Sequence, residues 1–340
     1  MASSAIIIEV KPLSFPWETR DPFIFCVHHR DAFPKGNAEM GPAVPLAGRQ
    51  IGQDFSAKDG WSMYHGKSMP GFPYHPHRGF ETVTIAKQGV IDHTDSLGAA
   101  GRFSSGDVQW MTAGKGVLHS EMFPLVNQET ENPLELFQIW LNLPKVSKFV
   151  QPHFKMLWNE KIPTLKELDA SGKTIEVNVI AGTLKGLTAL KPTPDSWAAH
   201  AENEVAIQTI KLDAHATWVL PKSKGSINRT LYFYKGDSMK MDGVDIPSYH
   251  SVRLKSDVDV SFVGGSTECL LLLLQGKPMN EPVVQHGPFV MNTEQEIRDA
   301  FAEYQRTQFG GWPWPNHEQA HAREKGRFAL HADGTEENMN

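Results

Sequence analysis

GFPYHPHRGFETVTIAKQG, residues 71–89, and GDVQWMTAGKGVLHSEM, residues 106–122, are the most informative stretches of this chain. Both contain short β-branched or apolar runs broken by glycine, a pattern that predicts strands joined by tight turns. Similar runs fill residues 45–125, so we expect a β-barrel in this part of the chain. The sharp turns are assigned to four glycines: Gly71, Gly79, Gly114 and Gly116.

Two pairs of potential metal ligands lie in these segments. Side chains alternate between the faces of a strand, so His75 and His77 point the same way, and so do His119 and Glu121. Three imidazoles and one carboxylate suit a divalent first-row metal rather than Mg²⁺ or Ca²⁺. Iron(II) is the leading candidate, with other divalent first-row metals as alternatives. Four ligands would satisfy zinc but would leave iron two positions for water, dioxygen or a substrate oxygen.

Several features compete with this assignment. One His-x-His motif among 15 histidines is weak by itself, and the later His-x-Glu motif strengthens it. Glu81, four residues after His77, can also face inward; Glu121 is preferred because its spacing repeats the first pair and because Gly79 can bulge the strand before Glu81. Nine other histidines are more simply explained as surface or hydrogen-bonded structural residues: His28, His29, His65, His93, His153, His200, His215, His250 and His286.

Composition limits the class of protein. A chain of 340 residues is long enough for two domains of average size. The net charge of −6 argues against direct nucleic-acid binding over the whole surface. Cys26 and Cys269 are the two cysteines, which favours neither a disulfide framework nor a cysteine-based zinc site and fits a reducing cytosol.

The N-terminal segment and the length of the apolar runs indicate the cellular compartment of the protein. The N-terminal residues, MASSAIIIEV, contain a short apolar run without a preceding basic residue, so no signal peptide is expected. No apolar stretch is long enough to span a bilayer, so no membrane partner is expected. The cytoplasm is the expected compartment, with the nucleus as the alternative in a eukaryote.

The pattern of elements predicts an all-β chain of two tandem barrels. We place an N-terminal, metal-binding domain at residues 1–148 and a C-terminal, metal-free domain at 149–312. A capping box at Thr293 and Glu296 starts a C-terminal helix over about residues 293–306. Residues 313–340 form a polar tail, expected to be disordered or loosely attached.

The sequence resembles the pirin family of the cupin superfamily in three motifs, HPHRGFETV, GDVQWMTAGKGVLHSEM and EPVVQHGPFVMNTEQEI. The resemblance runs from about Gly71 to Phe309. It implies two cupin barrels of the jelly-roll type with an iron-type site in the first, at the positions of His75, His77, His119 and Glu121. It also implies that the second barrel has lost its metal.

The resemblance also implies an activity, because some pirins act as quercetin 2,3-dioxygenases, which open a flavonol ring with dioxygen. A metal would bind the flavonol and lower the pKa of its hydroxyl, and Glu121 would ligate the metal or act as general base. Phe80, Trp110 and Met111 are candidate pocket walls for this flat substrate, with ordinary barrel core as the competing interpretation.

Two other functions stay open. Pirins that act as transcriptional coregulators imply an iron-redox switch that controls binding of a protein partner, either a transcription factor or a metabolic enzyme. A bicupin whose metal only stabilises the barrel, without turnover, is the third interpretation.

Overall fold

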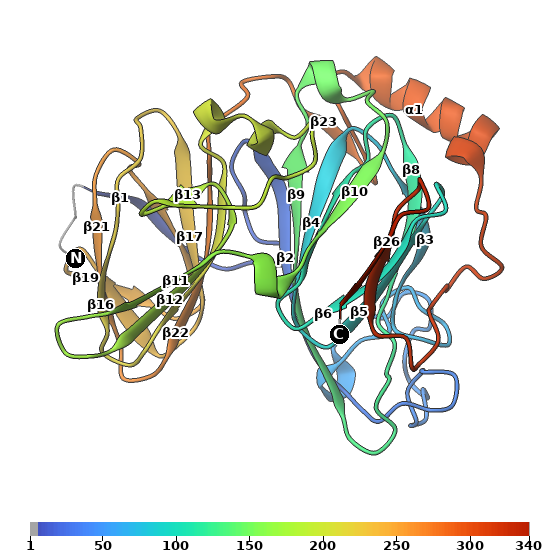
Figure 1. Ribbon diagram of the computed structural model, residues 1–340, viewed down its shortest axis with the longest axis horizontal. Helices are drawn as coiled ribbons and strands as arrows, with labels where there is room; N and C mark the ends of the chain where they lie inside the picture. The colour runs from blue at the N-terminus through green and yellow to red at the C-terminus, as the bar shows by residue number, and fades with distance from the viewer. Residues whose placement is uncertain (1–5, 340) are drawn as a thin grey trace. The chain divides into compact units, whose positions relative to one another are not determined.

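The computed structural model describes residues 6–339, so the first residues of the segment considered for a signal peptide and the last residue of the tail lie outside it. Strands dominate, and among the described residues α1 (Glu294–Thr307) is the one α-helix, which confirms the all-β prediction with a C-terminal helix (Figure 1). None of the helices in residues 6–339 has the length and apolar character needed to cross a membrane.

The chain divides into two compact units. Within the described residues, the first barrel consists of residues 27–159 and 281–339, and the second barrel of residues 6–26 and 160–280. This division differs from the predicted one at both ends of the chain. The N-terminal strand pairs within the second barrel, and the C-terminal helix and tail pack within the first.

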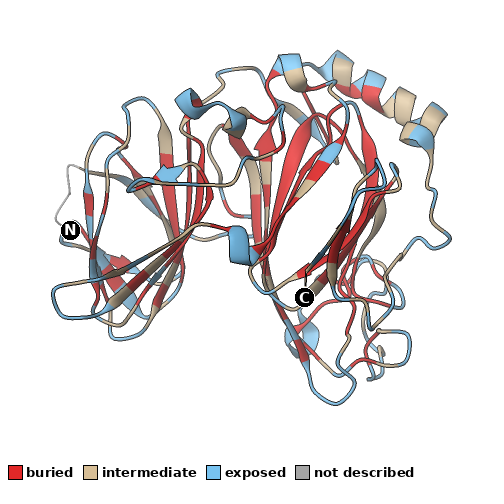
Figure 2. Cartoon of the chain, viewed as in Figure 1, coloured by how far each residue is buried: buried red, intermediate tan, exposed pale blue. Residues whose placement is uncertain are grey.

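The first barrel is built from two antiparallel sheets whose inner faces are buried (Figure 2). The five-stranded sheet has the order β10 (His153–Leu157), β7 (Val108–Thr112), β4 (Phe80–Gln88), β9 (Asn132–Asn142), β2 (Phe23–Phe33). The six-stranded sheet has the order β26 (Glu336–Met339), β25 (Arg327–Leu330), β6 (Ala100–Ser104), β5 (Val90–Asp95), β8 (Val117–Met122), β3 (Gly71–His77).

The turn between β3 and β4 depends on glycine. Gly79 has a φ of 84°, and a Cβ at this position would lie 2.0 Å from the carbonyl oxygen of Val290. Its N–H donates to the carbonyl of Gly114, which also has a positive φ and would clash with Val150 if it carried a side chain. A larger residue at either position would therefore displace backbone, which explains these two predicted turn glycines.

The second barrel also contains two larger antiparallel sheets. One has the order β1 (Ile7–Pro12), β20 (His250–Leu254), β17 (Asn228–Lys235), β22 (Cys269–Gly276), β15 (Ala206–Leu212), β12 (Thr174–Ala181), β11 (Thr164–Leu168). The other has the order β16 (Thr217–Leu220), β21 (Val260–Gly264), β18 (Ser238–Met241), β19 (Val244–Pro247). A short hairpin of β13 (Thr183–Leu184) and β14 (Leu187–Thr188) adjoins them in sequence.

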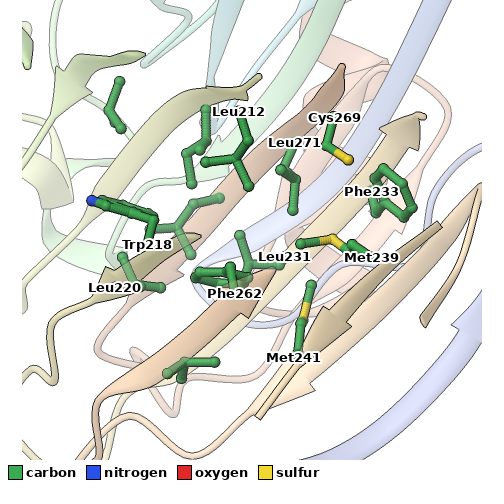
Figure 3. Close-up of a cluster of buried hydrophobic side chains, with 14 of the residues drawn as sticks. Leu212, Trp218, Leu220, Leu231, Phe233, Met239, Met241, Phe262, Cys269 and Leu271 are labelled. Atoms are coloured by element: carbon green, nitrogen blue, oxygen red, sulfur yellow. The ribbon is translucent and has the colours of Figure 1, made fainter. Parts of the chain in front are cut away.

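Apolar side chains fill the interior of the second barrel. Leu231, Phe233 and Leu271 come from the larger sheet, and Met241 and Phe262 come from the smaller one (Figure 3). All are buried. In the part of the chain that the structure describes, the cluster that fills this interior consists of thioether, aromatic, aliphatic and thiol side chains and contains no histidine.

Helix α1 starts as the sequence predicts. The Thr293 hydroxyl accepts the backbone N–H of Glu296, and the Glu296 carboxylate accepts the N–H of Thr293, which completes the capping box. Ile297 and Ala300 are buried against the hairpin formed by β23 (Val284–His286) and β24 (Phe289–Met291). This contact holds the helix on the first barrel.

The expectation of a loosely attached tail is wrong. Strand β25 pairs with β6, so the last residues extend the six-stranded sheet of the first barrel. Arg102 on β6 donates to the Asp92 carboxylate and also to the backbone carbonyls of His321, Ala322, Arg323 and Lys325. A polar tail escaped prediction because its backbone is held by an arginine more than 200 positions earlier in the chain.

Lys148, the predicted domain boundary, is buried inside the first barrel at 1% exposure. Its Nζ donates to the carbonyl of Gly79 at 2.8 Å, to Oδ1 of Asn142 at 2.8 Å and to the carbonyl of Val290 at 3.1 Å. Burial lowers the pKa of Lys148 to about 8. The ammonium group therefore ties three separate segments of the barrel together.

Replacing this lysine tests its contribution and its titration. We expect Lys148→Met to lower the free energy of unfolding by about 3 kcal/mol near pH 7, because three buried oxygens lose their donor. The native pKa of about 8 lies below the unfolded value of about 10.4, so the unfolded wild type binds more protons between these pH values. Wild-type stability should therefore rise there, and its advantage over the variant should grow by about 2 kcal/mol near pH 9.5. Urea denaturation of both proteins at several pH values measures the difference in their free energies of unfolding. A difference that does not change with pH would contradict the prediction.

Candidate metal centre

The pairing of β3 with β8 positions the histidines. His75 lies directly opposite His119, and His77 lies opposite Val117. Opposed residues of an antiparallel pair place their side chains on the same face, and so do residues two apart on one strand. His75, His77, His119 and Glu121 therefore share one face of the six-stranded sheet, as the alternation predicts. A register shift between Phe72 and His75 interrupts the pairing.

The three imidazoles form a compact cluster. One ring nitrogen from each of His75, His77 and His119 lies within 4.8 Å of the others, a spacing at which three ligands can hold one metal ion. The ring centroids are 4.5 to 4.8 Å apart. His77 and His119 are buried, whereas His75 is partly exposed. The accessible edge of the cluster is thus the His75 edge.

Backbone carbonyls select the tautomers of two histidines. His75 Nδ1 lies 2.9 Å from the carbonyl oxygen of Pro73, and His77 Nδ1 lies 3.4 Å from that of Pro288. A carbonyl can only accept, so both contacts favour a proton on Nδ1 and a lone pair on Nε2. The two Nε2 atoms face each other at 3.1 Å. Two lone pairs at this distance repel, unless a cation lies between them.

Burial keeps the cluster neutral. It lowers the pKa of His75 to about 4, and the pKa values of His77 and His119 lie well below the ordinary value. Desolvation is the main cause, and the neighbouring imidazoles add to it. Neutral imidazole is the form that binds metal ions.

His119 provides the clearest test of whether these residues fit a metal. Its side chain is 0% exposed, and neither ring nitrogen has a hydrogen-bond partner in the structure. Buried polar groups without a partner are costly and uncommon. A metal ion bound by one nitrogen of each ring would give His119 a partner at that nitrogen and remove the repulsion between the Nε2 atoms of His75 and His77, so the donor set fits.

The carboxylates of Glu121 and Glu81 have different surroundings. Thr84 Oγ1 lies 3.0 Å from Glu121 Oε1, and Gln138 Nε2 donates to Glu121 Oε2 at 2.6 Å. Burial raises the pKa of Glu121, and the Thr84 contact opposes this rise. Glu81 lies on β4 in the five-stranded sheet, where it accepts the Thr112 hydroxyl at 2.7 Å. In this structure neither carboxylate joins the group of three histidine nitrogens.

The three candidate pocket residues lie deep in the barrel. Phe80 contacts the His77 ring edge-on at 4.9 Å, and Met111 belongs to the hydrophobic core. Trp110 is 0% exposed. A pocket of about 340 Å³ lies at the partly exposed His75, and none of the three lines it.

Sequence reasoning missed the residues that hold Glu121 and flank His119. Thr84 and Gln138 come from β4 and β9 of the opposite sheet. His93, which was assigned a structural role, lies on β5 with its ring 5.7 Å from that of His119. Alternation along β4 and β9 would have placed Thr84 and Gln138 inside the barrel, but their pairing with Glu121 depends on how the two sheets face each other.

Sequence comparisons identify relatives over most of the chain. Residues 18–141 match the family model described as Pirin, and residues 207–310 match the Pirin C-terminal cupin domain. Pirin-1 of Arabidopsis thaliana is 38% identical over 244 residues, which are 71% of this chain and 78% of that protein. A Pseudomonas aeruginosa protein provisionally named quercetin 2,3-dioxygenase is 35% identical over 239 residues, 69% of this chain and 79% of that protein.

A solved structure agrees with these relatives. The crystal structure of quercetin 2,3-dioxygenase from Acinetobacter baumannii aligns with a TM-score of 0.67 and 28% identity, over 86% of this chain and 87% of that one. Together with the C-terminal cupin match, it confirms the predicted architecture of two cupin barrels with a C-terminal helix.

The neutral state of the cluster predicts how metal binding depends on protons. Three histidines with an ordinary pKa of about 6.5 would release about 1.5 protons at pH 6.5 on binding a metal. Here the lowered pKa values predict almost no release from the histidines. Calorimetric titration with Ni²⁺ or Zn²⁺ at pH 6.5, in two buffers of different ionisation enthalpy, measures the number of protons released for each metal ion bound.

Two variants complete this titration. His119→Ala should abolish the binding heat. Glu121→Gln removes the carboxyl group, so any proton that this variant still releases on metal binding comes from the histidines. If the Glu121→Gln variant releases more than about one proton for each metal ion that it binds, the histidines are charged before the metal binds and the prediction is wrong.

Proposed function

Because the chain belongs to the pirin family, we propose that it is a metal-dependent dioxygenase that opens a flavonol ring with dioxygen, as quercetin 2,3-dioxygenases do. The observation that carries the proposal is the cluster of three neutral histidines whose exposed edge, at His75, meets a pocket. The names of the Pseudomonas and Acinetobacter relatives supply the reaction class.

We assign the metal ligands to His75, His77, His119 and Glu121, with iron(II) as the ion. Glu121 shares a sheet face with the histidines and lies two positions from His119. Its present partners, Thr84 and Gln138, are neutral and can release one carboxylate oxygen while keeping the other. Only the first barrel is assigned a metal, because the interior of the second is packed with apolar side chains.

The chain's own residues bind and prepare the substrate. When bound, the metal supplies Lewis acidity, which lowers the pKa of a flavonol hydroxyl, and a centre at which dioxygen can react. Glu121 either stays a ligand or, once released from the metal, accepts the proton of that hydroxyl on a carboxylate oxygen; burial raises the pKa of the unbound carboxyl, which suits the second role. Gln138 and Thr84 orient the carboxylate. The buried surroundings of His77 and His119 keep bulk water away.

The two buried carboxylates provide a matched pair of variants for the ligand assignment. We expect Glu121→Gln to weaken metal affinity at least about tenfold, because a neutral amide replaces an anionic ligand. Glu81→Gln should change the affinity less than about twofold, because the Thr112 hydroxyl can donate equally to an amide oxygen. Competition titrations against a chromogenic chelator measure both. The reverse ranking would assign the ligand to Glu81.

The activity is tested by oxygen uptake. Iron-loaded wild type, prepared anaerobically, should consume oxygen with quercetin but not with a flavone that lacks the 3-hydroxyl group, because that hydroxyl is the one deprotonated. Removal of iron by a chelator, or His119→Ala, should abolish uptake. Stoichiometric iron without uptake would refute the dioxygenase and favour a redox-controlled binding protein.

A further inference from the structure

The tail contributes directly to the pocket at His75. His65, Lys67 and Tyr74 line the pocket together with two residues of the tail, His317 and Glu318. We call residues 312–318, which follow α1, the strap (Figure 1). The match to the C-terminal cupin family model ends at residue 310, so the strap lies outside the segment that matches that family model.

The strap is fixed in place by several contacts. The Glu318 carboxylate accepts the backbone N–H groups of Lys67, Ser68 and Met69 and the Ser68 hydroxyl, at 2.6 to 3.3 Å. The Trp314 indole donates to the carbonyl of Asp95 at 2.8 Å. These bonds attach the strap to the 67–69 loop and to the end of β5 in the first barrel, so this wall of the pocket is formed before any ligand binds.

The strap also encloses Tyr74, the neighbour of His75. The Trp312 ring stacks on the Tyr74 ring at 5.0 Å, and the His317 ring meets it edge-on at 4.7 Å. The backbone N–H of Tyr74 donates to the carbonyl of His317 at 3.1 Å. His317 is thereby held beside the one cluster histidine that is partly exposed.

The chemistry of the lining indicates what binds. His65, Lys67, Tyr74 and His317 can all donate hydrogen bonds from their side chains. The single carboxylate, Glu318, already has both oxygens bonded to donors of the 67–69 loop. The pocket therefore offers several hydrogen-bond donors, among them the Lys67 ammonium group, and these favour a ligand with anionic oxygens.

We propose that the strap is the outer wall of the ligand pocket, and that His317 and Lys67 are specificity-determining residues that select a planar aromatic ligand carrying phenolate oxygens. The proposal rests on the proposed function for its identification of the ligand as substrate. The pocket volume of about 340 Å³ lies within the range of small-molecule sites.

The test uses 4-nitrocatechol, a coloured catechol, as the probe of the full-length, iron-loaded protein. We expect His317→Ala and Lys67→Met each to raise its Kd about five- to tenfold, because a donor to an anionic oxygen is lost. Iron content should stay unchanged, and Lys67→Met leaves the backbone bond to Glu318 in place. His317→Gln, which keeps an N–H donor, should recover most of the affinity.

Matched controls separate a pocket effect from a general one. His153→Ala and Lys35→Met remove an exposed histidine and lysine of the same barrel outside this pocket, and should change the Kd less than about twofold. A dimethoxy analogue of the probe, which has no ionisable hydroxyl, should not distinguish wild type from the variants. Failure of wild type to bind 4-nitrocatechol, or equal Kd values in all proteins, would overturn the proposal.

Turnover distinguishes this inference from the proposed function. With quercetin, the two pocket variants should raise KM and leave kcat close to the wild-type value. Absence of turnover in wild type, combined with the expected Kd changes, would refute the dioxygenase and leave the pocket assignment standing. Turnover with unchanged KM in both variants would refute the pocket assignment alone.

Discussion

The antiparallel register between β3 and β8 is the constraint on which the centre depends. It sets His75 against His119, and a slip of one residue would turn one histidine pair to the opposite face. The register is supported from both sides, because β8 also pairs with β5, where Asp95 lies opposite His119. The Gly71 backbone, with a φ of 132°, approaches Glu121 and Met122 too closely for a side chain. The histidine cluster is therefore a product of strand pairing more than of local sequence.

Burial sets the protonation states of the residues that this register brings together. An exposed histidine cluster would be partly protonated near neutral pH, and its charges would repel both one another and a metal ion. Enclosure lowers the pKa values until the rings are neutral, and it leaves His119 without a hydrogen-bond partner. The same enclosure raises the pKa of Glu121. One property, exclusion of water, thus prepares both the imidazoles and the carboxylate for their proposed roles.

The sequence predicted those features that depend on local periodicity. Alternation placed four side chains on one face, and the Thr293 capping box marked the start of α1. Contacts between distant segments could not be derived in this way. Lys148 looked like part of a linker because its oxygen partners are backbone or amide groups brought together only by folding. The tail looked disordered because Arg102 and β6, which order it, carry no signal in its own composition. Thr84 and Gln138 meet Glu121 from the opposite sheet.

The discontinuity of the first barrel has a consequence for how the protein is made. Domains usually fold in the order in which the ribosome releases them. Here residues 27–159 emerge before residues 160–280, whereas α1, the strap and β25 belong to the same barrel as residues 27–159 and emerge after residue 280. The nascent first barrel has β6 as an exposed sheet edge while residues 160–280 of the second barrel are synthesised, and such edges invite aggregation. Completion of the pocket therefore has to wait until the segment that follows the second barrel has been synthesised.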